Sequence, residues 1–258
     1  MRASGRLRAV NLAGIRDRLA PLTPSFHARR RRRRLLADRY LSGNGIEIGA
    51  LHRPLRVPVG ASVRYVDRIA VAEMRQHYPE LSRDRLVEVD VIDDGETLSS
   101  QPDASLDFVV ANHFIEHTED PIGAIGNHLR VLRPGGIIYM AVPDRGQTFD
   151  SLRPPTGFTH VLRDHVDGPG WSRMTHFEEW ARYVERAPDE QVAPRAQALA
   201  DQKYSIHFHV WTPAEFAEML QSAQRDPGLG FEIAEMQTNG DECIFILRRP
   251  SPPQINHR

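Results

Sequence analysis

The sequence predicts an α/β protein whose mostly parallel sheet closes with an antiparallel hairpin. Short apolar segments alternate with helical or turn segments between residues 45 and 144, and this alternation indicates parallel strands joined by crossover connections. Several of these segments end in acidic residues, and ligands of such sheets bind at the carboxyl ends of the strands. The last two apolar segments flank Asn239-Gly240, a strong hairpin signal because both residues tolerate positive φ.

Four strands are expected in the first half of the chain. "GIEIG" at 45–49 is a short apolar strand, and "SVRYVDR" at 62–68 alternates apolar and polar residues. "RLVEVDVIDD" at 85–94 alternates in the same way. "SLDFVVANHF" at 105–114 is an almost continuous apolar run, which is typical of a strand buried on both faces.

Outside residues 145–206, the second half is expected to hold two helices and three further strands. "DPIGAIGNHLRVLRPGG" has apolar residues at helical spacing and a Pro-Gly-Gly stop, and "GIIYMAVPD" after it is a fifth strand. Thr212 is placed to cap a later helix, with Pro213 at its first position and Glu215 completing a capping box. "FEIAEMQT" and "ECIFILRR" then form the hairpin.

Length and composition indicate one globular domain. The chain has 258 residues, of which 40% are hydrophobic, enough to bury a core. Its one cysteine, Cys243, excludes an intramolecular disulfide and fits a reducing compartment. No apolar run approaches the length of a membrane span, and arginines interrupt the first residues where a signal peptide would need an apolar stretch. We therefore expect a soluble, cytoplasmic protein.

Basic charge is concentrated at the beginning of the chain. Residues 1–38 hold eleven arginines against two aspartates, so the remaining residues carry the negative balance. The run Arg29–Arg34 could contact nucleic acid or an anionic membrane through phosphates. No aromatic residues interleave with it to stack on bases, which favours a solvated helix face or flexible arm. We expect residues 1–38 to form a basic arm or helix, 39–249 the main domain, and 250–258 a flexible tail.

The segment "DFVVANHFIEHTEDPIGAIGNHLRVLRPGGIIYMAVPD" resembles the central half of a class I S-adenosylmethionine (SAM) dependent methyltransferase of small molecules. The similarity covers about residues 40–145, and 206–249 by pattern. It implies a Rossmann-like methyltransferase fold, SAM as cofactor, and direct methyl transfer to a small molecule or sugar hydroxyl with histidine-assisted deprotonation. "EIGALHRPL" and "IHFHVW" are similar to segments of bacterial proteins associated with glycan assembly, which implies a glycan acceptor.

The resemblance also implies cofactor-binding residues near the ends of the first four strands. In chain order they are Glu47, Gly49, Ala50, Asp67, Asp90, Val91, Asn112 and His113. Asp67 would accept the ribose hydroxyls, Asp90 would lie by the adenine, and Asn112 would form part of the floor of the site. The separation of Glu47 and Asp67 agrees with a ribose-binding acid on the neighbouring strand tip.

The loop after the first strand departs from the family pattern. Leu51 and Arg53 stand where two further glycines are usual, and Pro54 and Pro58 leave little room for the usual first helix. A dinucleotide needs such glycines to approach its pyrophosphate, whereas SAM has no phosphate, so the loop disfavours NAD more than SAM. The alternative is a non-catalytic methyltransferase-like binding or adaptor protein with a degenerate loop.

Residues 145–206 are too long for an ordinary connection and are expected to form an insertion, or lid, over the active face. The lid and the segment after it contain five histidines: His160, His165, His176, His207 and His209. These could supply a base, hold a metal with nearby aspartates, or pack the lid with three tryptophans. We expect His209 to be the base, with His165 and His176 as further catalytic residues, and assign no metal. His207 and His209 should share one face of an extended segment, and "THFEEWARYV" should be a capped helix that carries His176.

Overall fold

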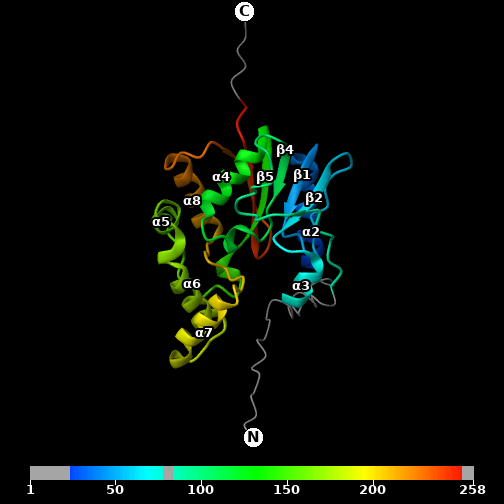
Figure 1. Cartoon of the computed structure of the whole chain (residues 1–258). Helices are drawn as coiled ribbons and strands as arrows, with labels where there is room; N and C mark the ends of the chain where they lie inside the picture. Colours follow the sequence, from blue (N-terminus) through cyan, green and yellow to red (C-terminus); the bar gives the residue numbers. More distant parts are fainter. Residues whose placement is uncertain (1–23, 78–83, 252–258) are drawn as a thin grey trace, which may run out of the picture.

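The computed structural model describes residues 24–77 and 84–251. Its centre is a seven-stranded sheet (Figure 1). In chain order the strands are β1 (Asn44–Ile48), β2 (Ser62–Asp67), β3 (Val91–Ile92), β4 (Leu106–Val110), β5 (Leu132–Pro143), β6 (Glu232–Thr238) and β7 (Glu242–Arg248). Their spatial order is β3-β2-β1-β4-β5-β7-β6. The first five strands are parallel, and β7 lies antiparallel between β5 and β6. This order confirms the Rossmann-like methyltransferase fold with its closing hairpin.

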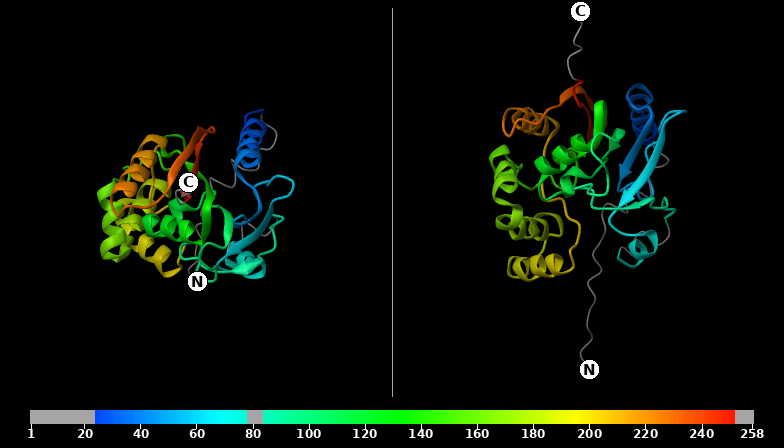
Figure 2. Two further views of the ribbon diagram at one scale, coloured as in Figure 1. Left: turned by 90° about the horizontal axis from the view of Figure 1, so that it is seen from above. Right: turned by 45° about the horizontal axis from the view of Figure 1, so that its top comes forward.

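The helices lie on both faces of the sheet and in the insertion (Figure 2). They are α2 (Pro24–Tyr40), α3 (Val71–His77), α4 (Pro121–Val131), α5 (Phe158–Asp167), α6 (Arg173–Glu179), α7 (Asp189–Asp201) and α8 (Pro213–Arg225). Short turns are η3 (Ile115–His117), η4 (Arg145–Gln147), η5 (Pro169–Trp171) and the π-helical η6 (Trp180–Val184). Within the described ranges, no helix is long and apolar enough to cross a bilayer.

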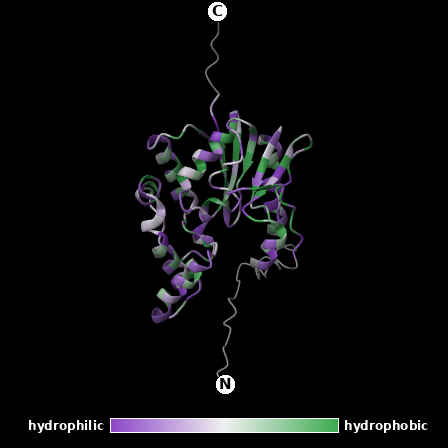
Figure 3. Cartoon of the chain, viewed as in Figure 1, coloured by the Kyte–Doolittle hydropathy of each residue, from purple (hydrophilic) through white to green (hydrophobic). Residues whose placement is uncertain are grey.

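Two hydrophobic clusters cover the two faces of the sheet, and hydrophobic residues are concentrated in its central strands (Figure 3). On one face, Leu36 and Ala37 of α2 pack with Phe108 and Tyr139. On the other face, residues of α4 and α8 pack on residues of β1, β4 and β5. Each fully buried Leu or Phe contributes about 1.5–3 kcal/mol relative to an exposed one, so α2 is part of the domain.

Helix α2 contains the arginine run, and its arginines are divided between the protein and solvent. Arg29 pairs with Asp241, and Arg33 pairs with Glu242. The other arginines of the run, Arg30, Arg31, Arg32 and Arg34, are exposed. The expectation of a solvated helix face is therefore correct for only part of the run. Residues 1–23 of the expected basic segment lie outside the described residues.

The insertion begins after β5 and forms its own small core. Phe177, Trp180, Leu199 and Phe208 are among the buried residues of this core. Helix α6 begins at Arg173, two residues before the expected helix, and its N-terminus has no side-chain cap. The insertion leaves and rejoins the sheet at one place, because Asp144 bridges Trp211 and the Arg145 N–H donates to the Trp211 carbonyl at 2.9 Å. We call this place the neck of the lid.

The local signals near the end of the chain are confirmed. The Thr212 side chain accepts from the Glu215 N–H, and the Glu215 carboxylate accepts from the Thr212 N–H, so the capping box is complete. Gly240 has φ +78° in the hairpin turn, and the Asn239 N–H donates to the Glu242 carbonyl at 2.8 Å. Cys243 is buried in β7.

Candidate active site

The loop after β1 leaves an open backbone position at the carboxyl edge of the sheet. Gly49 has φ +62°, and a Cβ placed on it would meet no atom within 4 Å, so a ligand can approach this peptide closely. Ala50 follows it and is half-buried. Leu51 also has positive φ, +50°, which costs an L-residue about 1 kcal/mol or more. The loop therefore keeps a left-handed conformation at a position where the family pattern has glycine.

Glu47 holds this loop against β1. The side chain is 1% exposed, and its two carboxylate oxygens accept from the Leu55 N–H at 2.9 and 3.0 Å. Burial raises its pKa to about 7, although the Leu55 hydrogen bond and the Arg33 charge oppose the shift. The described residues 49–61 contain no helix, as the two prolines predict. Glu47 thus supports the cofactor loop from inside the protein.

Asp67 ends β2 at the edge where the sequence predicts it. It is half-buried, and burial raises its pKa even though the backbone N–H groups of Ile69 and Arg68 donate to it. Val91 pairs with Val66 inside the sheet, and Asp67 pairs with Ile92. Position 67 is therefore level with the end of β3.

Asp90 lies before β3 and not at its end. Its carboxylate accepts from the Tyr65 N–H at 2.8 Å, which ties it to the middle of β2. Two other acids follow β3: Asp93 is buried and accepts from Ser100, whereas Asp94 is exposed and accepts from a nearby N–H. The sequence predicts Asp90 by the adenine, whereas the acids that directly follow β3 in the structure are Asp93 and Asp94.

Asn112 and His113 follow β4. The Asn112 Oδ1 accepts from the Ala141 N–H at 3.0 Å, and its buried Nδ2 has no hydrogen-bond partner among the described residues. His113 has φ +50°, with Nε2 2.8 Å from Glu242 and Nδ1 3.5 Å from Glu116. Burial lowers the His113 pKa, but these two carboxylates outweigh it and raise the pKa to about 9. The Arg33 guanidinium lies against the same nitrogen, with Nη2 2.9 Å from His113 Nε2.

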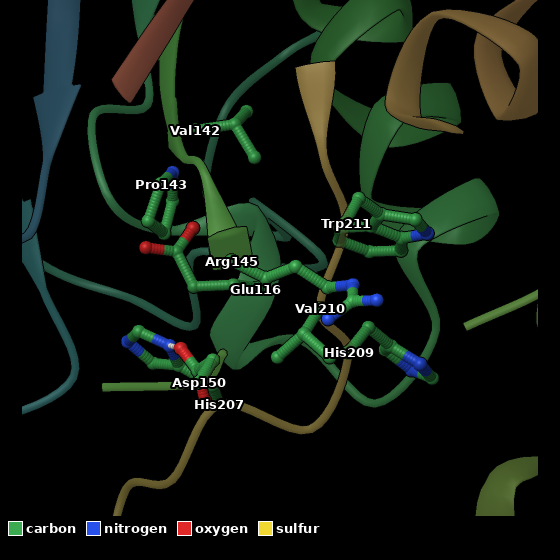
Figure 4. Close-up of a pocket in the computed structure, with 9 residues that line it drawn as sticks. All are labelled: Glu116, Val142, Pro143, Arg145, Asp150, His207, His209, Val210 and Trp211. Carbon is green, nitrogen blue, oxygen red and sulfur yellow. Dashed lines mark hydrogen bonds and ion pairs between the residues drawn. The ribbon is translucent and has the colours of Figure 1, made fainter. Parts of the chain in front are cut away.

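A small pocket lies one strand further along, between the end of β5 and the neck of the lid (Figure 4). The residues that line it are Glu116, Val142, Pro143, Arg145, Asp150, His207, His209, Val210 and Trp211. Glu116 is 1% exposed, and neither carboxylate oxygen has a hydrogen-bond partner in the described part of the chain. Burial raises the Glu116 pKa, but three neighbouring histidines, of which His113 contributes most, hold it below its usual value.

His207 is oriented in this pocket by a carboxylate. Its Nδ1 lies 2.7 Å from Asp150 Oδ2, so Nδ1 carries the proton and Nε2 is left as the basic nitrogen. Arg153, itself buried, donates to Asp150 at 3.2 Å and to the His207 carbonyl at 2.6 Å. Burial raises the Asp150 pKa, but the hydrogen bonds and charges of His207 and Arg153 outweigh it, so the carboxylate stays ionised.

His209 is a poor base in this environment. It is 1% exposed, its Nε2 lies 3.4 Å from the Glu119 carbonyl and 3.6 Å from Asp164, and burial lowers its pKa to about 3, with His176 contributing. His207 and His209 line the same pocket but contact different partners.

The other two predicted catalytic histidines lie outside the pocket lining. His165 Nδ1 is 2.9 Å from Asp120, whose side chain caps α4, so His165 joins the lid to the domain. His176 Nε2 is 3.0 Å from His160 Nε2. The sequence gives no sign of the contact between His207 and Asp150, because the two residues are 57 positions apart in the chain.

Comparisons with known proteins agree with this architecture. Residues 43–140 match the family model described as "Methyltransferase domain". A Mycolicibacterium smegmatis protein named as a probable S-adenosylmethionine-dependent methyltransferase is 35% identical over 81 residues, which are 31% of this chain and 28% of that protein. The chain therefore matches less than a third of the relative's length.

Solved structures of methyltransferases are also similar. One is a chain from a complex that contains the Haloferax volcanii Trm112 methyltransferase activator, with 17% identity, TM-score 0.48, and coverage of 92% of this chain and 93% of that chain. Another is the Burkholderia thailandensis 1,6-didemethyltoxoflavin-N1-methyltransferase, with 15% identity, TM-score 0.47, and coverage of 93% and 88%.

The sheet order and the open strand edge define a class I methyltransferase fold. Residues 43–140 are thus similar to the methyltransferase domain family and, in part, to a probable SAM-dependent methyltransferase. The glycan acceptor that the sequence implies stays a prediction.

Proposed function

We propose that this protein transfers the methyl group of SAM to a hydroxyl of a small molecule that binds against the residues drawn in Figure 4. The observation that carries this proposal is the His207–Asp150 pair, 2.7 Å apart. It lines a pocket at the end of β5, and β5 is next but one to β1 in the sheet. A base beside the acceptor and a cofactor on the adjacent strands are what direct transfer requires.

The residues at the strand edge fit SAM. The open backbone at Gly49 suits the methionine moiety, Asp67 suits the ribose hydroxyls, and the unpartnered Asn112 Nδ2 offers a donor to the bound cofactor. We place Asp94 by the adenine, in the role that the sequence prediction gave to Asp90. When bound, SAM supplies a methyl group on a positively charged sulfur.

The protein's own part in the reaction is to orient the acceptor and take its proton. Asp150 fixes the His207 ring, so Nε2 can remove the hydroxyl proton as the oxygen attacks the methyl carbon. Glu116 lies in the same pocket with two unpartnered oxygens, and its negative charge favours the imidazolium that forms. Trp211, at the neck of the lid, is buried and lines the same pocket, and apolar side chains beside a base limit the access of water.

Calorimetric titration with S-adenosylhomocysteine tests the cofactor site. We expect binding in the micromolar range for the wild type, about −8 kcal/mol, and a loss of at least about tenfold in Asp67→Ala, because two ribose hydrogen bonds are removed. Asp103→Ala is the matched control, because Asp103 is an exposed residue that precedes β4 at the opposite edge. A folded wild type that binds no S-adenosylhomocysteine would favour the adaptor alternative.

A further inference from the structure

A second group of ionisable side chains lies close together inside the lid. The proposed methyl transfer gives these side chains no role. His160 and Asp164 are four residues apart on one face of α5, His176 is on α6, and His209 is on the segment before α8. Asp164, His176 and His209 are buried, and the His160 side chain is 27% exposed. Three separate segments thus bring three imidazoles and one carboxylate to a single place.

Three distances between possible ligand atoms of the four side chains are close to the edge length of a tetrahedron around zinc. His160 Nε2 is 3.0 Å from His176 Nε2 and 3.2 Å from Asp164 Oδ2, and His209 Nε2 is 3.6 Å from Asp164 Oδ2. One possible ligand atom from each residue lies within 4.8 Å of all the others. Zinc bonds of about 2.0–2.1 Å to nitrogen and oxygen in tetrahedral geometry place the ligand atoms about 3.3 Å apart.

Hydrogen bonding within the cluster leaves its central atom unsatisfied. Asp164 Oδ2 is buried and has no hydrogen-bond partner of acceptable geometry in the described part of the chain. The other oxygen, Oδ1, accepts from the Ser172 hydroxyl at 2.7 Å. An unpartnered buried carboxylate oxygen costs about 1–3 kcal/mol or more, so a cation at the point where the histidines converge would remove this cost.

Outer contacts orient the ligands in the way that metal sites require. Ser172 fixes the Asp164 carboxylate, and His176 Nδ1 faces Glu179 Oε2 at 3.8 Å, on the side away from His160. Arg153 in turn donates to Glu179 at 3.1 Å. Carboxylates behind a ligating imidazole fix its orientation and raise its basicity.

We propose that His160, Asp164, His176 and His209 form a binding site for a structural divalent cation of the zinc class in the lid. Three imidazoles and one carboxylate suit Zn²⁺, whereas Mg²⁺ and Ca²⁺ prefer oxygen ligands only. Four protein ligands complete a tetrahedral shell and leave no open position for substrate, which is typical of a structural site. The ion joins α5, α6 and the segment that leads back to the neck.

Metal content after zinc loading and desalting tests the site without any methyl-transfer assay. We expect the wild type to retain about one zinc ion per chain and the His176→Ala and Asp164→Ala variants to retain less than a tenth of that amount. His165→Ala is the matched control, because His165 is on the same helix as His160 but contacts Asp120 instead. This control should retain zinc like the wild type.

Cobalt substitution keeps the test decisive if the variants fail to fold. Co²⁺ bound to wild-type protein should show the strong visible d–d absorption of a four-coordinate ion, and Zn²⁺ should abolish it in a one-to-one titration. The proposal is overturned if the wild type retains no more zinc than His176→Ala, or if its cobalt spectrum is that of a six-coordinate ion. Either result leaves the cofactor site to be judged by its own titration.

Discussion

His207 and His209 are separated by one residue, yet they differ in what their environments allow. His207 is oriented by Asp150 and keeps Nε2 free. His209 lies by Asp164, fully enclosed, with its pKa lowered to about 3 by burial. A histidine that stays neutral far below neutrality is a weak proton acceptor but a good metal ligand, since ligating imidazole must be neutral. The difference comes from which aspartate each ring meets.

Replacing His207 tests the proposed base. In His207→Gln we expect kcat to fall at least about a hundredfold, because general-base assistance is lost, while the affinity for S-adenosylhomocysteine stays unchanged. Steady-state kinetics with an accepted substrate and calorimetry measure the two effects. His165→Gln is the control, since His165 lies outside the pocket lining. A kcat for His207→Gln that equals the wild-type value would limit His207 to packing.

Among the helices and strands, the sequence predicted best those ends that are determined by contacts between residues close together in the chain. The capping box at Thr212 and the hairpin turn at Asn239 form within a few residues, so the sequence is sufficient to place them. The strand β3 is different. It is the edge strand of the sheet, and only Val91 and Ile92 of the alternating segment 85–94 pair with β2. Alternation indicates one buried face but does not show how many residues find a partner.

Helix α2 shows a second limit of sequence patterns. A run of arginines gives no sign of which ones will be buried, because their partners, Asp241 and Glu242, are more than two hundred residues away. Arg33 Nε donates to Glu242 at 2.8 Å, and the Tyr139 hydroxyl donates to the Arg33 carbonyl at 3.1 Å. The run therefore contributes to folding in addition to any surface role.

Arg33 should stabilise the protein much more than its neighbours in the run. Arg33→Ala would leave Glu242, 4% exposed, without its arginine partner and with His113 as its remaining ion-pair partner, so we expect a loss of about 2 kcal/mol in the free energy of unfolding. Arg31→Ala, at an exposed position, should change it by less than about 0.5 kcal/mol. Urea denaturation of both variants measures the difference. Equal losses would show that the buried pair contributes nothing specific.

For the whole molecule, buried neutral histidines make folding sensitive to acid. Burial lowers the pKa of His117 and of His128 to about 4. His128 is fully buried on α4, and its Nε2 lies 2.8 Å from the Gly95 carbonyl. Because the folded pKa is below the unfolded value of about 6.5, the contribution to stability is present above pH 6.5 and is lost as pH falls toward 4.

Replacing His128 should flatten this acid dependence. In His128→Gln, whose amide can still donate to Gly95, we expect the slope of unfolding free energy against pH between 6.5 and 4 to decrease by up to one proton. The loss of stability over that range should shrink by about 3 kcal/mol. Urea denaturation at a series of pH values measures it, with His165→Gln as the control. Parallel curves for His128→Gln and the wild type would contradict a buried neutral imidazole.

Only those residues of the candidate site whose place depends on the end of a single strand could be predicted from the sequence. Gly49 and Asp67 lie at the strand edge as the sequence indicates. Asp94, His207 and the lid cluster could not be chosen in advance, because each depends on contacts between remote segments. The contacts of Asp90 with the Tyr65 N–H and of His209 with Asp164 could not be read from the sequence either.

The neck of the lid has a consequence for how this fold can diversify. Asp144 and Trp211 are paired, so the chain leaves the sheet and returns to it at nearly the same point. The free energy of closing such an insertion rises only slowly with its length, so the paired strands tolerate insertions of different size, provided that the new one covers the part of the core that Val161 of α5 covers here. Evolution could therefore replace the lid by an insertion of different size, and so change the methyl acceptor, while the strands that bind the cofactor stay the same.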